Sequence, residues 1–148
     1  MTSTAKPIPH VYHTATPYLT VEGADKLIDF LEQVFEAKET ERLTRPDGTV
    51  GHADVWIGDS VIMLAEASGE WQPMPGAIHL YVDDTDATYQ RARQAGATSL
   101  MEPADQFHGD RMAGVKDPFG NVWWIVTHVE DVSPEELHRR VDASWKQV

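Results

Sequence analysis

The 148-residue sequence contains no cysteine, which excludes disulfide bonds, a thiolate nucleophile and structural zinc held by thiolates. No apolar run approaches the roughly 18 residues that a membrane-spanning helix requires, so we expect no such helix. The N-terminal residues also lack the apolar core of a secretory signal. These absences together predict a cytoplasmic protein.

Positive charge is scarce as well. The chain carries 12 Lys and Arg against 24 Asp and Glu, a formal net charge of -12 at pH 7. Nucleic-acid binding proteins show a basic footprint, and anionic membranes attract basic surfaces. We therefore expect neither nucleic acid nor membrane as a partner, and the acidic balance favours neutral or cationic ligands.

Hydrophobic patterning predicts a sequence of short elements in the first half of the chain. Residues 16–21 alternate as in a strand, and apolar residues between 24 and 35 recur at helical spacing. A polar edge strand follows. Two further strands are joined at Gly58-Asp59, which is typical of a tight hairpin.

The same order of elements returns in the second half. A strand, a helix and three strands are predicted between residues 77 and 128, with a hairpin turn at Asp117-Pro118-Phe119-Gly120. One shift of 61 residues relates Leu19 to Leu80 and Met63 to Trp124. A final helix over about 133–147 is predicted from Ser133 and Pro134 at its start.

Five phrases of the sequence stand out, in this order: YHTATPYL (12–19), DGTVGHADVWIGDSVIMLAE (47–66), HLYVDDTDA (79–87), DQFHGDR (105–111) and DPFGNVWWIVTHVEDVSPEEL (117–137). Together they resemble the vicinal oxygen chelate superfamily, which includes glyoxalase I, bleomycin resistance proteins and extradiol dioxygenases, and in particular its PhnB-like branch. The resemblance implies one α+β domain over residues 1–148, built from two βαβββ modules at about 12–68 and 76–130. Their mixed sheets would curl into an open cup with the helices outside, and the protein would be a homodimer.

Metal-dependent members of that superfamily hold a divalent cation with four side chains from the first and fourth strand of each module. By resemblance those positions are Thr16, Met63, Ala77 and Trp124, and none of them is a histidine or a carboxylate. We therefore predict no metal and no other cofactor. A different metal site built from His52, Asp54 and His79 stays open as an alternative.

Strand alternation assigns side chains to the predicted cup. If Gly58-Asp59 is a two-residue turn, Asp54 lies opposite Met63 and on its face. In the second hairpin Ala113 is expected opposite Trp124, which would place Arg111 and Val115 inward and leave Trp123 on the helix side. The predicted ligand-binding residues are Thr16, Tyr18, His52, Asp54, Trp56, Met63, His79, Tyr81, Phe107, Arg111 and Trp124.

These residues allow more than one interpretation. His52 and Asp54 suit a general base with its orienting carboxylate, a pair of ligand contacts or a structural hydrogen-bonded pair, and His79 is a third catalytic candidate. Arg111 suits a salt bridge with Asp105 or Asp110, or a clamp on an anionic ligand group. The loop that holds Phe107 and His108 suits a lid. For His128 we expect only a structural role.

Three functions follow from these interpretations. The leading hypothesis is a metal-free small-molecule binding protein of the glyoxalase/bleomycin-resistance type, whose aromatic cup binds an organic ligand. The second is a lyase, isomerase or oxygenase in which His52 or His79 transfers a proton or a different metal site acts. The third is a structural dimer whose cup is filled by its own side chains. The sequence leaves open whether the protein is an enzyme.

Overall fold

The computed structural model describes residues 4–145, apart from the side chain of Ser144. The chain divides into two compact units, Met1–Pro75 and Gly76–Val148, and each contains one four-stranded sheet. No helix within the described residues is long and apolar enough to cross a membrane.

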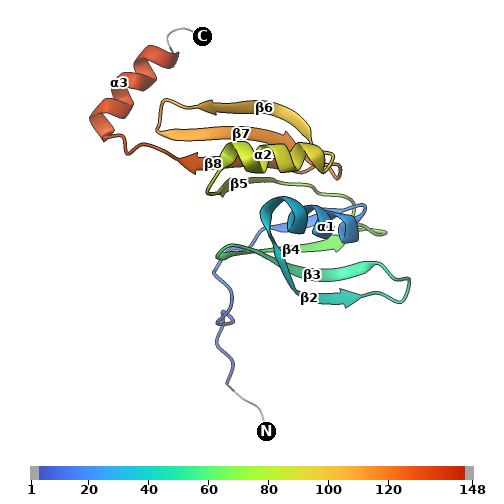
Figure 1. Cartoon of the computed structure of the whole chain (residues 1–148). Coiled ribbons are helices and arrows are strands. Elements are labelled where there is room, and N and C mark those ends of the chain that lie inside the picture. Colours follow the sequence, from blue (N-terminus) through green and yellow to red (C-terminus); the bar gives the residue numbers. More distant parts are fainter. Residues whose placement is uncertain (1–3, 146–148) are drawn as a thin grey trace. The chain divides into compact units, whose positions relative to one another are not determined.

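The first unit folds in the predicted order (Figure 1). Its elements are β1 (Tyr18–Val21), α1 (Ala24–Phe35), β2 (Lys38–Thr44), β3 (Val50–Ile57) and β4 (Ser60–Glu66). The strands are ordered β1-β4-β3-β2, with β1 parallel to β4 and the other pairs antiparallel. The first strand begins at Tyr18, so Thr16, which we expected inside it, lies in the segment before β1.

The core of the first unit lies between α1 and one face of its sheet. The apolar stripe of α1 includes Leu27, Ile28 and Leu31, all fully buried. The facing strands contribute the buried side chains of Ala53, Val55, Ile62 and Leu64, which confirms the predicted helix-covered face. Because side chains alternate along a strand, the residues between these point away from α1.

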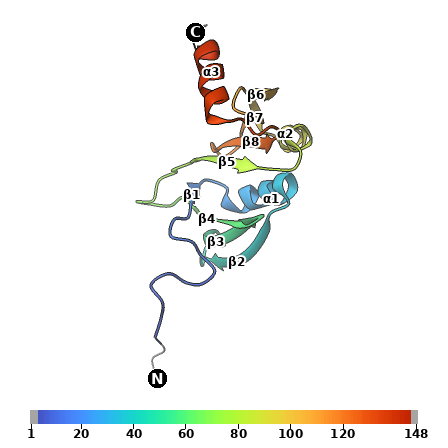
Figure 2. The ribbon, with the colours of Figure 1, turned by 90° about the vertical axis from the view of Figure 1, so that its left-hand side faces the viewer.

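The second unit repeats this architecture and adds a helix. Its elements are β5 (Ala77–Tyr81), α2 (Thr85–Gln94), β6 (Thr98–Asp105), β7 (Asp110–Lys116), β8 (Val122–His128) and α3 (Pro134–Trp145). The strands are ordered β5-β8-β7-β6, with β5 parallel to β8. Figure 2 shows α3 projecting beyond the end of the second unit's sheet. Residues 146–147, which we expected in this helix, lie outside the described residues.

The two βαβββ modules and the α+β class are thus confirmed, and both sheets are open and mixed. The predicted shift of 61 residues holds for the parallel pairs. Tyr18 pairs with Met63 in the first sheet, and His79, 61 positions after Tyr18, pairs with Trp124 in the second. The parallel strand pairs of the two modules therefore match residue for residue.

The register of the second hairpin differs from our prediction by one residue. Gly114, and not Ala113, lies opposite Trp124. The reason is the turn, which spans the five residues 117–121 because the Asp117 carboxylate accepts hydrogen bonds from the backbone N–H and the side-chain amide of Asn121, both at 2.9 Å. A slip of one residue moves every side chain of a strand to the opposite face. Arg111, Ala113 and Val115 therefore face α2.

Candidate functional site

The face of the first sheet that points away from α1, here called the first distal face, gathers most of the predicted site residues of this unit. The pairing of β3 with β4 places Asp54 opposite Met63, as predicted, and β1 places Tyr18 on the other side of Met63. These three residues form a row across three strands. The face carries Tyr18, His52, Asp54, Trp56 and Met63.

A hydrogen-bonded network centres on the Asp54 carboxylate, which is only 3% exposed. Nε2 of His52 lies 2.8 Å from Asp54 Oδ1, and the Tyr12 hydroxyl donates to Oδ2. Nδ1 of His52 lies 3.3 Å from the Tyr18 hydroxyl. The hydrogen bond to Asp54 raises the pKa of Tyr12, and burial adds to this increase. Two donors thus satisfy the buried carboxylate.

Tyr12 was not among the predicted site residues. It lies in the segment before β1, where no strand or helix periodicity indicates the direction of a side chain. Its position in the phrase YHTATPYL, next to the predicted first strand, is the only sequence signal that could have drawn attention to it.

The face of the second sheet that points away from α2, the second distal face, carries His79, Tyr81 and Trp124. Trp124 is half-buried and lies against Gly114, where a Cβ atom would come within 2.3 Å of its Cζ3 atom. Trp123 is fully buried on the opposite face and donates from Nε1 to Asp117 at 2.7 Å. The adjacent tryptophans therefore face opposite sides of the sheet, as the alternation predicts.

A second polar network, which we did not expect, surrounds the buried carboxylate of Asp110. The Tyr81 hydroxyl donates to it at 3.1 Å, and the ring nitrogens of His128 and His108 lie at 2.8 and 3.4 Å. Burial acts to raise the pKa of Asp110, but the hydrogen bonds from His128 and Tyr81 outweigh it and lower the pKa. Asp110 shares this face because of the one-residue register shift, so the correct register was needed to find it.

His128, for which we expected only a structural role, joins two carboxylates. Its Nε2 lies 2.7 Å from Asp131 and its Nδ1 2.8 Å from Asp110. The hydrogen bond to Asp131, and next that to Asp110, raises the pKa of His128. Because each ring nitrogen can donate only when it carries a proton, the doubly protonated ring satisfies both contacts.

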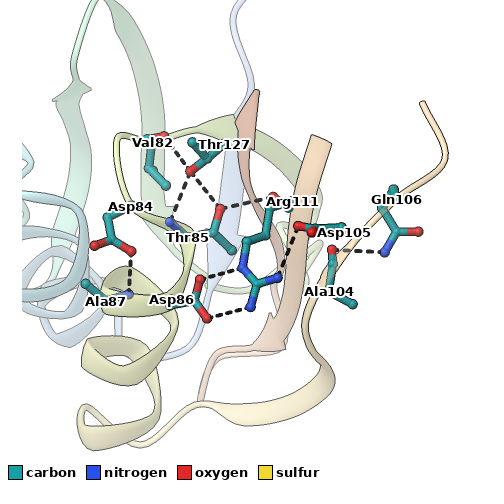
Figure 3. Close-up of polar contacts among 10 residues, drawn as sticks. All are labelled: Val82, Asp84, Thr85, Asp86, Ala87, Ala104, Asp105, Gln106, Arg111 and Thr127. Carbon is teal, nitrogen blue, oxygen red and sulfur yellow. Dashed lines mark hydrogen bonds and ion pairs between the residues drawn. The ribbon is translucent and has the colours of Figure 1, made fainter. Parts of the chain in front are cut away.

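The expected position of Arg111 is wrong because its strand has the other register. Figure 3 shows its guanidinium between α2 and β6, where it donates to both carboxylate oxygens of Asp86, at 2.6 and 2.9 Å, and to Asp105 at 3.1 Å. These hydrogen bonds raise the pKa of Arg111. The salt bridge with Asp105 was one of the two predicted interpretations. Both carboxylates hold the guanidinium on the α2 side of the sheet.

Phe107 lies in the loop between β6 and β7. Its ring centroid is 6.4 Å from that of Trp145 in α3 and 5.2 Å from that of His108. The guanidinium of Arg140, also in α3, donates to the Phe107 carbonyl at 3.1 Å. The loop is therefore fixed to the C-terminal helix of its own unit.

The four positions that correspond to superfamily metal ligands do not fit a divalent cation. Met63 and Trp124 lie on the distal faces of their sheets, but a thioether and an indole are not the oxygen or imidazole ligands that such cations require. Thr16 precedes β1, and Ala77 has only a methyl side chain. Among residues 4–145, no three His, Asp or Glu side chains are grouped so that they could hold a metal ion.

The sequence model of the glyoxalase/bleomycin resistance protein/dioxygenase superfamily matches residues 8–125. The chain belongs to this superfamily. Sequence comparison finds relatives of this chain, among them the uncharacterized protein Mb0911c of Mycobacterium bovis. The two proteins are 37% identical over 133 residues, and the match covers 82% of this chain and 88% of the relative. The uncharacterized protein Rv0887c of Mycobacterium tuberculosis is also 37% identical, over 82% of this chain and 78% of its own.

Solved structures of other proteins share the fold of this chain. TioX from Micromonospora sp. ML1 is 24% identical, with a TM-score of 0.62 over 78% of this chain and 99% of its own. The PhnB protein from Bacillus cereus is 16% identical, with a TM-score of 0.65 over 78% of this chain and 99% of its own. At these identities the likeness establishes the superfamily fold and nothing finer.

Proposed function

We propose that this superfamily member is a small-molecule binding protein that takes up an organic ligand without a metal ion. The observation that carries the proposal is the first distal face, where a satisfied polar network lies beside aromatic and thioether side chains. Binding sites for organic ligands combine apolar surface with a few fixed polar groups. The polar groups here are His52 and Asp54, and the apolar ones are Tyr18, Trp56 and Met63.

The side chains at the superfamily's metal-ligand positions support the metal-free part of the proposal. Met63 occupies such a position and is half-buried on the first distal face, where a thioether offers apolar contact in place of metal coordination. The formal net charge of -12 supports a neutral or cationic ligand. We further propose that the protein acts in the cytoplasm as a homodimer.

A thermal-shift screen with organic compounds, thioesters, cationic antibiotics and divalent metals tests this proposal. A ligand at 100 times its dissociation constant stabilises the folded state by about 2.7 kcal/mol, which raises the melting temperature by roughly 5–10 °C in a protein of this size. Trp56→Leu should weaken the affinity for the ligand at least tenfold and so reduce the thermal shift. The control Trp71→Leu, at an exposed loop position, should leave it unchanged. A stoichiometric metal on the first distal face would contradict the proposal.

The 2.8 Å contact between His52 and Asp54 favours one second candidate, an enzyme in which His52 transfers a proton. The two functions differ in the effect of His52→Gln. In an enzyme, the variant would lose turnover and keep most of its ligand affinity. In a binding protein, the variant would lose affinity, and neither the wild-type protein nor the variant would show turnover.

A further inference from the structure

The two ring nitrogens of His52 have unequal partners. Nε2 faces Asp54, a buried carboxylate, at a normal hydrogen-bond distance of 2.8 Å. Nδ1 faces the hydroxyl of Tyr18 at 3.3 Å, which is long for a hydrogen bond, and Tyr18 is 48% exposed. Nδ1 is therefore the nitrogen at which a polar ligand atom can replace or join the tyrosine hydroxyl.

The contacts of Asp54 determine where the proton of His52 lies. Tyr12 donates to Oδ2, so the carboxylate acts as an acceptor there, and Oδ1 is left to accept from Nε2–H. In the neutral ring Nδ1 then carries a lone pair and accepts a proton. A proton added at Nδ1 leaves the Nε2–H hydrogen bond to Asp54 Oδ1 in place.

Two side chains of the row, Met63 and Tyr18, offer apolar surface on the same face of the sheet as His52. Met63 lies between Tyr18 and Asp54 in the strand register and is half-buried. A thioether makes favourable contacts with aromatic rings, and the ring centroid of Tyr18 is 5.7 Å from that of His52. An aromatic ligand that lies on Met63 can direct a substituent toward Nδ1.

Building on the proposed binding function, we infer that the ligand of the first distal face is an aromatic compound with a weakly acidic hydroxyl, a phenol, which is bound as its phenolate. On binding, the ligand O–H bond breaks, its electron pair stays on oxygen and its proton passes to Nδ1 of His52. The phenolate oxygen then accepts hydrogen bonds from Nδ1–H and from the Tyr18 hydroxyl. Asp54 is a positioning residue that holds Nε2.

The charge of the protein separates a phenol from a carboxylic acid as the ligand. With a formal net charge of -12, the chain repels ligands that are anionic in solution. A phenol whose pKa is close to that of imidazole is mostly neutral at pH values below that pKa, and it becomes charged only when its proton passes to Nδ1. Proton transfer within the site leaves the total charge of the complex unchanged, so the acidic surface does not oppose it.

The probe 4-nitrophenol tests the inference in the full-length protein, because its phenolate absorbs visible light and its neutral form does not. At a pH at which the free probe is mostly neutral, we expect the bound probe to show the phenolate band. We expect 4-nitroanisole, which has the same ring and no acidic proton, to bind at least tenfold more weakly. His52→Gln should abolish the band, and His138→Gln, an exposed position in α3, should preserve it.

The outcomes separate this inference from the proposed function. Binding of both probes with equal affinity, with 4-nitrophenol in its neutral form, would overturn the inference and leave the binding function intact. Failure of both probes, when the thermal-shift screen finds another ligand on this face, would do the same. If the screen finds no ligand of any class, the binding function itself fails. Nitrogen NMR of His52 in the wild-type complex checks the proton directly, since both ring nitrogens should be protonated.

Discussion

Removal of the Asp117 carboxylate should destabilise the second unit more than almost any other single side-chain change in its turns. Asp117 is buried and accepts four hydrogen bonds, from the backbone N–H groups of Phe119 and Asn121, the Asn121 amide and the Trp123 indole, at 2.7–2.9 Å. Asp117→Ala takes away this acceptor from every one of these donors. The turn that sets the register of β7 on β8 then loses the acceptor that all four hydrogen bonds share.

The magnitude follows from the burial of the donors. The side chains of Asn121 and Trp123 are both 0% exposed, so water cannot replace the carboxylate without rearrangement of the turn. A buried donor that loses its acceptor costs about 1–3 kcal/mol, which gives about 2–6 kcal/mol for the two side chains. Since small domains are stable by about 5–15 kcal/mol, this is a large fraction of the total. Asp117→Asn retains one acceptor oxygen and should lose less.

Urea denaturation measures the loss. With a slope of about 2 kcal/mol per molar urea, a loss of 4 kcal/mol moves the midpoint by about 2 M. The matched control is Asp47→Ala, because exposed Asp47 also accepts two bonds within a turn, from the N–H and hydroxyl of Thr49. Its loss should stay near 0.5 kcal/mol. Equal losses in the two variants would refute the link between burial of the donors and stability.

Two further predictions concern the second distal face and its edge. Gly114→Ala should lower the free energy of unfolding, measured in urea, by about 1–3 kcal/mol, because the new methyl meets the Trp124 ring. In a protein that already carries Trp124→Leu, the same substitution should cost much less. An equal cost of Gly114→Ala in the two backgrounds would contradict the register. Hydrogen bonds to Asp131 and then Asp110 raise the pKa of His128, so its stabilisation is complete below the unfolded-state pKa of about 6.5 and is lost as pH rises through the higher folded-state pKa. Asp131→Asn should lower the NMR titration midpoint of His128, and an unmoved midpoint would count against the contact.

The first hairpin could be predicted in detail because its turn is short and explicit. Gly58, with a φ of 57°, adopts a conformation that glycine favours, and with Asp59 it forms a two-residue turn. That turn fixes the register of β3 on β4, so Asp54 lies opposite Met63 as predicted, and alternation along β1 places Tyr18 on the same face. The first distal face was therefore largely accessible from the sequence.

The second hairpin could not be predicted to the residue because Asn121 is ambiguous. In the sequence it precedes an apolar run and counts as the first residue of a strand. In the fold it belongs to the turn and is fully buried, and its Oδ1 accepts from the Gly76 N–H at 3.0 Å. The contact with Gly76 comes from a residue 45 positions earlier in the chain, which local patterns do not encode, and the turn contacts with Asp117 depend on this buried position of Asn121. Because of this difference of one residue in the register, we did not predict Asp110 on the second distal face, and we placed Arg111 on the wrong face.

The cap of α1 has a consequence for the order in which the two helices fold. The N–H groups of Gly23 and Ala24 donate to the carboxylate of Glu66, which lies more than 40 positions later in the chain. In α2 the cap is Asp84, directly before the first helical residue. Closure of a long loop costs chain entropy before its contacts contribute, so α1 gains its cap only after β4 reaches β1. We therefore expect α2 to nucleate from local contacts and α1 to form late, although the two modules end in the same architecture.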